Sequence, residues 1–112
     1  MAVPMIRLLH TNGCSGGSLE AARETLHEAL AEVGLTDLPV AEILIVTEEQ
    51  SREHGMVGGP AIMVNGLDVD PAVRGMRVGG LGCRAYITPA DISSAPPRDM
   101  IVAALRAALA GD

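Results

Sequence analysis

The sequence predicts a single α/β domain with about four short strands in a mixed sheet and three helices. Three observations support this prediction. Short apolar runs alternate with amphipathic helical patterns, a hairpin signal lies in the second half of the chain, and 112 residues that are 48% apolar suit one modest core. We therefore expect one domain over residues 1–112, with no interdomain linker.

The first strand and first helix are predicted at residues 5–9 and from Ser18 to Gly34. Residues 5–9 (MIRLL) are apolar and precede turn residues, as in a buried strand. Ser18 can cap the helix, and Gly34 can end it by taking left-handed dihedrals. Apolar residues in between recur at helical steps and form one stripe: Leu19, Ala22, Leu26, Ala29, Leu30 and Val33.

A second strand and a short second helix follow. Residues 41–46 (AEILIV) are rich in β-branched side chains, which favours a strand. Thr47 and Gln50 have the spacing of a capping box, so a helix should begin there. We expect this helix to end near His54, with Gly55 as its stop.

The second half of the chain predicts a hairpin and a last helix. Asn65-Gly66 is the preferred pair for a two-residue type I′ turn, so residues 61–64 should pair with residues 67–70. Pro97 and Gly111 flank an apolar helical pattern over residues 98–110. The glycine-rich stretch between these two elements is expected to be a mobile loop at the pole of the sheet that also carries Cys14.

Charge and composition argue against two classes of partner. All eight basic residues are arginine, fourteen residues are acidic, and the net charge is −6, so the positive surface that grips a nucleic acid backbone is not expected. No apolar run approaches the ~20 residues of a membrane span. We expect a cytoplasmic protein with no nucleic acid partner, no membrane partner and no cofactor, and we leave its oligomeric state open, a homodimer included.

Cys14 is the first candidate site residue. It lies in the turn TNGCSGGS, directly before a predicted helix, where the helix dipole and free N–H groups stabilise a thiolate. Gly13, Gly16 and Gly17 leave space for a substrate to approach the sulfur. The alternative is a tight turn that holds an ordinary buried cysteine.

Cys83 and His10 are weaker candidates. Two cysteines in an intracellular chain indicate reactive or metal-binding thiols before a structural disulfide. Cys83, Ala85 and Ile87 alternate with polar or aromatic neighbours, which would also fit a cysteine on the core face of a strand. His10, at the end of the first strand, is either a base for the thiol or a solvent-facing histidine.

The order strand, cysteine turn, helix, strand, helix, Gly-Pro, hairpin, helix resembles the thioredoxin-like fold over nearly the whole chain. More closely, the chain is similar to small bacterial thioredoxin-like proteins grouped with the alkylmercury (organomercurial) lyases. The similarity rests on the GC turn, on the hairpin GGPAIMVNG, which follows a G-x-P-x-I-x-V-x-G pattern, and on a late C-R-x-Y segment. It implies a three-layer α/β/α arrangement and a cis Gly59-Pro60 bond that faces Cys14.

The resemblance also implies a site. Cys14 and Cys83 would be the catalytic pair, or the two sulfur ligands of Hg(II), and the surrounding substrate-binding positions would be Gly13, Ser15, Gly59 and Pro60. This chain departs from the pattern at Gly17, where a thioredoxin has its resolving cysteine and the lyases have an aspartate. Exchange within a CxxC motif is therefore impossible, and a replacement acid would have to be Asp68, Asp70 or Asp91.

Three classes of function remain open from the sequence. The first is a thiol enzyme, either a variant organomercurial lyase or a thiol–disulfide oxidoreductase that uses Cys14 and Cys83. The second is a binding module for a soft metal or a thiol-reactive ligand, and the third is a scaffold protein of a specialised pathway. We expect Cys14 to be the more reactive thiol, because its acidity is raised by the helix N-terminus.

Overall fold

The computed structural model describes residues 3–12, 18–76 and 80–111. In its first half, strands and helices alternate: β1 (Ile6–His10), α1 (Ser18–Glu32), β2 (Val40–Leu44) and α2 (Glu48–His54). Three strands follow, β3 (Val57–Gly59), β4 (Ala61–Val64) and β5 (Leu67–Asp68). The last part contains a 3-10 turn η1 (Pro71–Val73), then β6 (Gly80–Cys83), β7 (Tyr86–Ile87), β8 (Ile92–Ser93) and α3 (Arg98–Ala110). The predicted α/β class is confirmed.

Four strands form a mixed sheet in the order β2-β1-β4-β5. β1 is parallel to β2 and antiparallel to β4, and β5 returns antiparallel to β4. Because Leu9 pairs with Ala61, the end of β1 and the start of β4 lie at the same pole of the sheet. β5 returns toward this pole, which is where Cys14 was expected from its position after β1.

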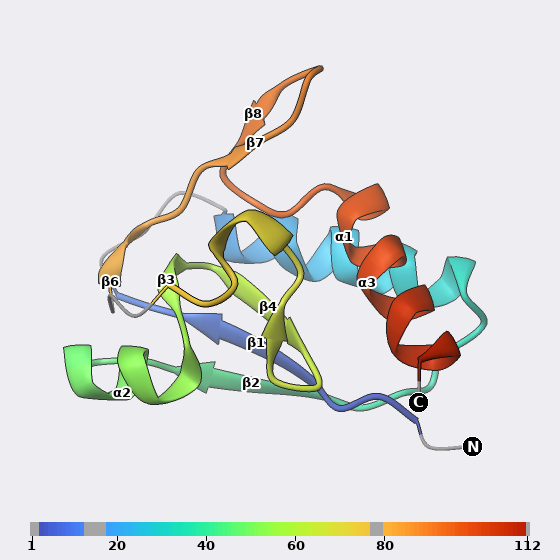
Figure 1. Ribbon diagram of the computed structural model, residues 1–112, viewed down its shortest axis with the longest axis horizontal. Coiled ribbons are helices and arrows are strands. Elements are labelled where there is room, and N and C mark those ends of the chain that lie inside the picture. The colour runs from blue at the N-terminus through green and yellow to red at the C-terminus, as the bar shows by residue number, and fades with distance from the viewer. Residues whose placement is uncertain (1–2, 13–17, 77–79, 112) are drawn as a thin grey trace.

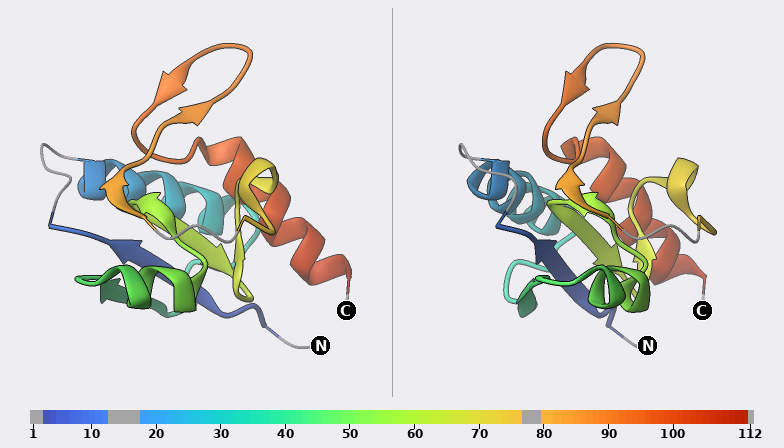
Figure 2. Two further views of the ribbon diagram at one scale, coloured as in Figure 1. Left: turned by 60° about the vertical axis from the view of Figure 1, so that its left-hand side comes forward. Right: turned by 90° about the vertical axis from the view of Figure 1, so that its left-hand side faces the viewer.

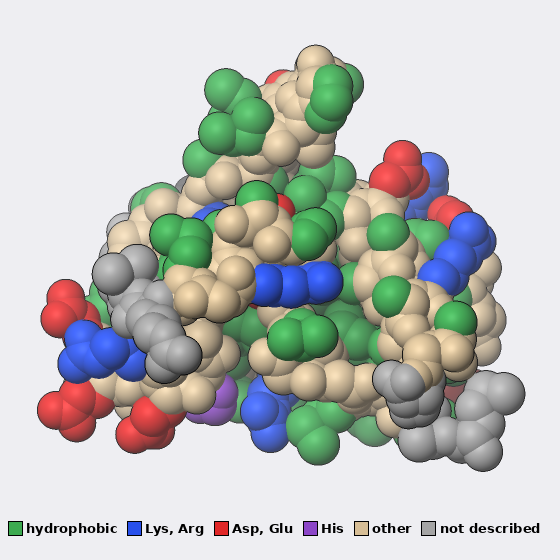
Figure 3. All heavy atoms as spheres, in the orientation of Figure 1, with side chains coloured by type: hydrophobic (Ala, Val, Ile, Leu, Met, Phe, Trp, Pro, Cys, Tyr) green, Lys and Arg blue, Asp and Glu red, His purple; other side chains and the backbone are tan. Residues whose placement is uncertain are grey.

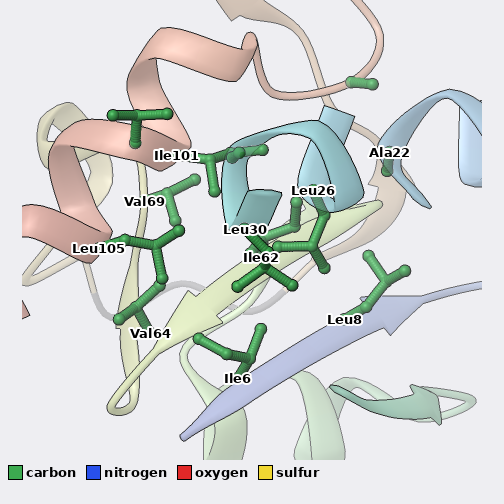
Figure 4. Packing of buried hydrophobic residues seen from close by; sticks show 13 residues of the cluster. Ile6, Leu8, Ala22, Leu26, Leu30, Ile62, Val64, Val69, Ile101 and Leu105 are labelled. Carbon is green, nitrogen blue, oxygen red and sulfur yellow. The ribbon is translucent and has the colours of Figure 1, made fainter. Parts of the chain in front are cut away.

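The two longer helices lie on one side of this sheet. α1 and α3 pack together on one side, and α2 lies on the other (Figures 1 and 2). Side chains from β1, β4, α1 and α3 meet in the larger core cluster, which is drawn in Figure 4. A smaller cluster of Leu9, Ile45, Met56, Ala61 and Met63 fills the opposite face. β4 is buried at all four positions because it packs on both sides.

Local signals placed two of these elements correctly. Thr47 accepts a hydrogen bond from the Gln50 backbone, and the Gln50 side chain accepts one from the Thr47 backbone, so the predicted capping box is present. Asn65 and Gly66 have φ values of 52° and 81°, which is the type I′ geometry expected between β4 and β5. The hairpin is shorter than predicted, since β5 ends at Asp68 and the chain then turns into η1.

From Cys83 to Ile87, buried and exposed side chains alternate in the opposite sense to the one expected if Cys83 lay on the core face of a strand. Arg84 and Tyr86 are buried, whereas Cys83, Ala85 and Ile87 are exposed. The interior accepts the two polar side chains because both find partners there, as described below. The predicted loop is also partly structured, since it contains η1 and β6.

The hairpin β7–β8 projects from the body (Figure 1). Hydrophobic side chains gather on it in Figure 3, and its cross-strand pair Ile87 and Ile92 is 72% and 68% exposed. Within the described residues, no helix has both the length and the apolar character needed to cross a membrane.

Candidate functional site

Three segments distant in sequence converge where β1 ends. Cys83 of β6 is the register partner of Gly59, the last residue of β3, and the Arg84 backbone N–H donates to the Gly59 carbonyl at 3.0 Å. A Cβ atom on Gly59 would lie 3.4 Å from Cγ2 of Thr11 and 3.6 Å from Cα of His10. Gly59 therefore lies between the end of β1 and the Cys83 strand, and its missing side chain lets the segments approach.

The peptide bond between Gly59 and Pro60 is cis. This part of the prediction is confirmed, whereas the expected contact of Pro60 with Cys14 lies outside the described residues. The Tyr86 hydroxyl donates a 2.7 Å hydrogen bond to the Pro60 carbonyl, and both residues are buried. The aromatic residue of the C-R-x-Y segment thus fixes the turn that precedes β4.

Cys83 is exposed, and it is disulfide-bonded. The chain contains one other cysteine, Cys14, which lies outside the described residues together with Gly13 and Ser15. Of the predicted site residues, the structure therefore places Cys83, Gly59 and Pro60, and it brings these three together. The sequence indicated reactive or metal-binding thiols before a disulfide, and the disulfide at Cys83 corrects this expectation. Whether the two cysteines meet was left open.

A buried ion pair anchors the residue that follows Cys83. Arg84 donates two hydrogen bonds to the Asp68 carboxylate, at 2.9 and 3.1 Å, and the two side chains are 5% and 3% exposed. The guanidinium also lies 4.5 Å from the centre of the Tyr86 ring. A bidentate, charge-assisted pair of this kind fixes orientation as well as distance. The pair therefore ties the Cys83 segment to the β4–β5 hairpin.

The carboxylates considered as replacement acids are occupied elsewhere. Asp68 binds Arg84 and also accepts a hydrogen bond from the Asp70 backbone at 2.8 Å. Asp70 caps η1 by accepting from the Ala72 backbone, and its carboxylate lies 3.7 Å from Arg84. Asp91 is exposed in the turn of the projecting hairpin, where its carboxylate accepts from the Ile92 backbone.

Burial and charge act in opposite directions on Arg84 and Tyr86. Burial disfavours the charged guanidinium, but the hydrogen bonds to Asp68 and the negative charges of Asp68 and Asp70 outweigh it, so the pKa of Arg84 is raised. Burial also raises the pKa of Tyr86, and the two carboxylates add to this effect although the Arg84 charge opposes it. Tyr86 therefore stays a neutral donor to Pro60 far into the alkaline range.

Thr11 and His10 complete the surroundings of Gly59. Thr11 is buried, and within residues 3–12, 18–76 and 80–111 its hydroxyl has no hydrogen-bond partner. His10 is half-buried, and its carbonyl accepts from the Ile45 backbone at 2.8 Å. Near this strand end, the pKa of Glu42 is lowered first by its hydrogen bonds with Arg23 and further by the charges of Arg23 and His10, against the opposing effect of burial. A role for His10 as a base stays a prediction.

No protein-family model matches the chain, and neither a curated protein nor a solved structure matches it. Within residues 3–12, 18–76 and 80–111, no group of three or more histidine, cysteine, aspartate or glutamate side chains is arranged to hold a metal ion. The feature that points to a function is therefore the convergence of Cys83, Gly59, Pro60 and Thr11.

Sequence reasoning missed the roles of Asp68, Arg84 and Thr11. A signal for the first two was present, because Asp68 lies in the apolar run that follows a hairpin turn, and a carboxylate there needs a cationic partner. The sequence does not show that this partner is Arg84, because the distance between Asp68 and Arg84 depends on the path of the 15 residues between them. No sequence signal marks a threonine whose hydroxyl will be buried without a partner.

Tyr86 should make the fold less stable at alkaline pH. The folded protein holds the Tyr86 proton above the ordinary pKa of about 10, whereas the unfolded chain releases it there. The folded state then binds more protons, so the free energy of unfolding should fall as pH rises above about 10. Urea titrations across this range should show a shallower decline for Tyr86→Phe. Because Tyr86 is the sole aromatic residue, tyrosinate absorbance reports it directly, and ionisation of the folded wild type near pH 10 would contradict the prediction.

Proposed function

We propose that this protein performs thiol–disulfide exchange through Cys14 and Cys83 on a thioredoxin-like domain. The observation that carries the proposal is that Cys83 is disulfide-bonded at the position paired with Gly59, directly before the cis Pro60. Cys83 is exposed at a pole of the sheet, so other thiols can reach its sulfur, and exposed disulfides are the labile, regulatory or catalytic ones.

The position of Thr11 supports Cys14 as the second sulfur. Thr11 contacts the Gly59 position, and Gly59 is paired with Cys83. Cys14 follows Thr11 by three residues, which span at most ~11 Å when extended. A disulfide needs Cα atoms within about 7 Å, so this short connection keeps Cys14 within reach of Cys83.

The fold supports the thioredoxin-like part of the proposal. The mixed sheet of four strands, in the order β2-β1-β4-β5 and with β4 antiparallel to its neighbours, supports the resemblance to that fold. In this arrangement the cysteine turn connects β1 to α1. We propose a three-layer α/β/α arrangement as part of this thioredoxin-like fold.

The proposed reaction uses Cys83 in place of a cysteine at Gly17. The Cys14 thiolate attacks one sulfur of a substrate disulfide, which breaks that bond and leaves a mixed disulfide and a substrate thiolate. The Cys83 thiolate then attacks Cys14, forms the protein disulfide and releases the second substrate thiolate. The substrate gains two electrons and the protein loses two, and a small dithiol returns the protein to its reduced form.

Soft-metal binding is the second candidate, because the same two sulfurs could hold Hg(II) as a linear dithiolate. Cleavage of an organomercurial also needs a proton donor at the leaving carbon. Asp68 and Asp70 are engaged by Arg84 and by backbone N–H groups, and Asp91 caps a projecting turn. We therefore carry mercury binding, and not carbon–mercury cleavage, as the alternative.

The test uses one equivalent of a symmetric aromatic disulfide that releases a coloured thiol. Reduced wild-type protein should release both aromatic thiols per reagent molecule and end as its own disulfide, because Cys83 resolves the mixed disulfide. Cys83→Ser should release one and keep the other bound at Cys14, as seen by intact mass. Cys14→Ser is the matched control and should react more slowly than Cys83→Ser.

Two outcomes would count against the proposal. A wild type that retains the aromatic group would show that the two cysteines do not act together. Equally slow reaction of all three proteins, combined with protection of both wild-type thiols by one equivalent of Hg(II), would favour metal binding.

A further inference from the structure

The Thr11 hydroxyl is an unusual group in this fold. Thr11 is 8% exposed, and its hydroxyl oxygen is buried with no hydrogen-bond partner among the residues that the structure describes. A threonine hydroxyl can donate one hydrogen bond and accept two, and leaving it unpaired in the interior is costly. Buried polar groups without partners are rare in native proteins and call for a physical explanation.

The surroundings of Thr11 point toward the sulfur of Cys83. The methyl carbon Cγ2 of Thr11 lies 3.4 Å from the position where Gly59 would carry a Cβ atom, and the hydroxyl is attached to the same carbon as this methyl group. Residues that are paired across neighbouring strands direct their side chains to the same face of the sheet. Since Gly59 is paired with Cys83, the Cys83 side chain leaves its strand on the face that Thr11 lines, and Gly59 places no side chain between them.

We propose that the Thr11 hydroxyl donates a hydrogen bond to the sulfur anion that forms when the Cys83 disulfide is reduced. This inference rests on the proposed thiol–disulfide function. Disulfide sulfurs are neutral and accept hydrogen bonds weakly, so the Cys83 sulfur is a poor acceptor for the hydroxyl in the oxidised protein. Reduction creates a thiolate, which accepts a charge-assisted hydrogen bond.

A dithiol supplies the two electrons that reduce the protein disulfide. One thiolate of the dithiol attacks a sulfur of the protein disulfide, the S–S bond breaks, and one protein sulfur leaves with the electron pair as a thiolate. The second thiolate of the dithiol then displaces the other protein sulfur and closes the reagent into its own cyclic disulfide. Thr11 acts on the Cys83 sulfur, in the step where that sulfur leaves as the thiolate.

The test compares Thr11→Val with Thr11→Ser. Valine keeps the shape of threonine and removes the hydroxyl, whereas serine keeps the hydroxyl and removes the methyl group. In a Cys14→Ser background, which leaves Cys83 as the only thiol, we expect Thr11→Val to raise the thiol pKa, read from thiolate absorbance against pH, by about one pH unit. At a pH above the Cys83 pKa, where the thiolate is the populated form, the disulfide of Thr11→Val should also become about tenfold harder to reduce in a glutathione redox buffer. Thr11→Ser should stay close to the wild type in both measurements.

The stability of the two redox states separates this role from ordinary packing. Removing an unpaired buried hydroxyl should leave oxidised Thr11→Val at least as stable to urea as the wild type, while the reduced form loses stability. Equal thiol pKa values in the two variants, or an equal loss of stability in both redox states of Thr11→Val, would overturn the inference. Failure of the proposed function is distinguishable, because the wild type would then retain the aromatic group in the exchange assay whatever the Thr11 variants do.

Discussion

Replacing Asp68 with asparagine is expected to lower the free energy of unfolding by about 3 kcal/mol. The substitution keeps the shape and an oxygen acceptor but removes the charge that faces Arg84, whose side chain is 5% exposed. An uncompensated buried charge costs several kcal/mol because it has lost water and gained no counter-charge. Urea unfolding followed by far-UV circular dichroism measures this loss.

Asp70→Asn is the matched control for this prediction. Asp70 is 14% exposed and lies 3.7 Å from Arg84, and asparagine can still accept the hydrogen bond from the Ala72 backbone. We expect it to cost about 1 kcal/mol or less. If Asp68→Asn costs no more than Asp70→Asn, the bidentate pair does not anchor the Cys83 segment.

The helices and the hairpin could be predicted because their signals are local. Thr47 and Gln50 form a capping box at any position in a fold, and Asn65-Gly66 selects its turn without help from distant residues. The recurrence of apolar side chains at three- and four-residue steps in α1 is also a local signal, because it follows the helical period. The strand positions were less accurate at their ends, since β2 begins at Val40 and ends at Leu44, earlier than the apolar run suggested.

The candidate site could be predicted only in part because its contacts are long-range. Cys83 and Pro60 were recognised from a resemblance, but the inward orientation of Arg84 and Tyr86 depends on Asp68 and on the Pro60 carbonyl. From a single sequence, Arg84 would be placed on the surface, because arginine is rarely buried. β3 and β6 were missed for a related reason, since strands of three and four residues that are rich in glycine have no period to detect.

Replacing Gly58 with alanine is expected to lower the free energy of unfolding by about 2 to 3 kcal/mol and to make the disulfide easier to reduce. Gly58 has φ +124°, a conformation that a side chain strains by about 1 to 3 kcal/mol. A Cβ atom there would also lie 3.1 Å from the Gly82 carbonyl oxygen and 3.5 Å from that of Cys83. Because these are backbone atoms of β6, the strand must shift, and the distortion acts directly on the residue that carries the disulfide.

Gly66→Ala separates backbone strain from the displacement of β6. Gly66 also has a positive φ, +81°, but nothing lies within 4 Å of the added carbon. Its variant should lose about 1 kcal/mol from the left-handed backbone alone and should keep the wild-type equilibrium with a glutathione buffer. Gly58→Ala should shift that equilibrium toward the reduced protein, the direction opposite to Thr11→Val. If the two alanine variants have the same redox equilibrium, the close contact between β3 and β6 does not control the Cys83 disulfide.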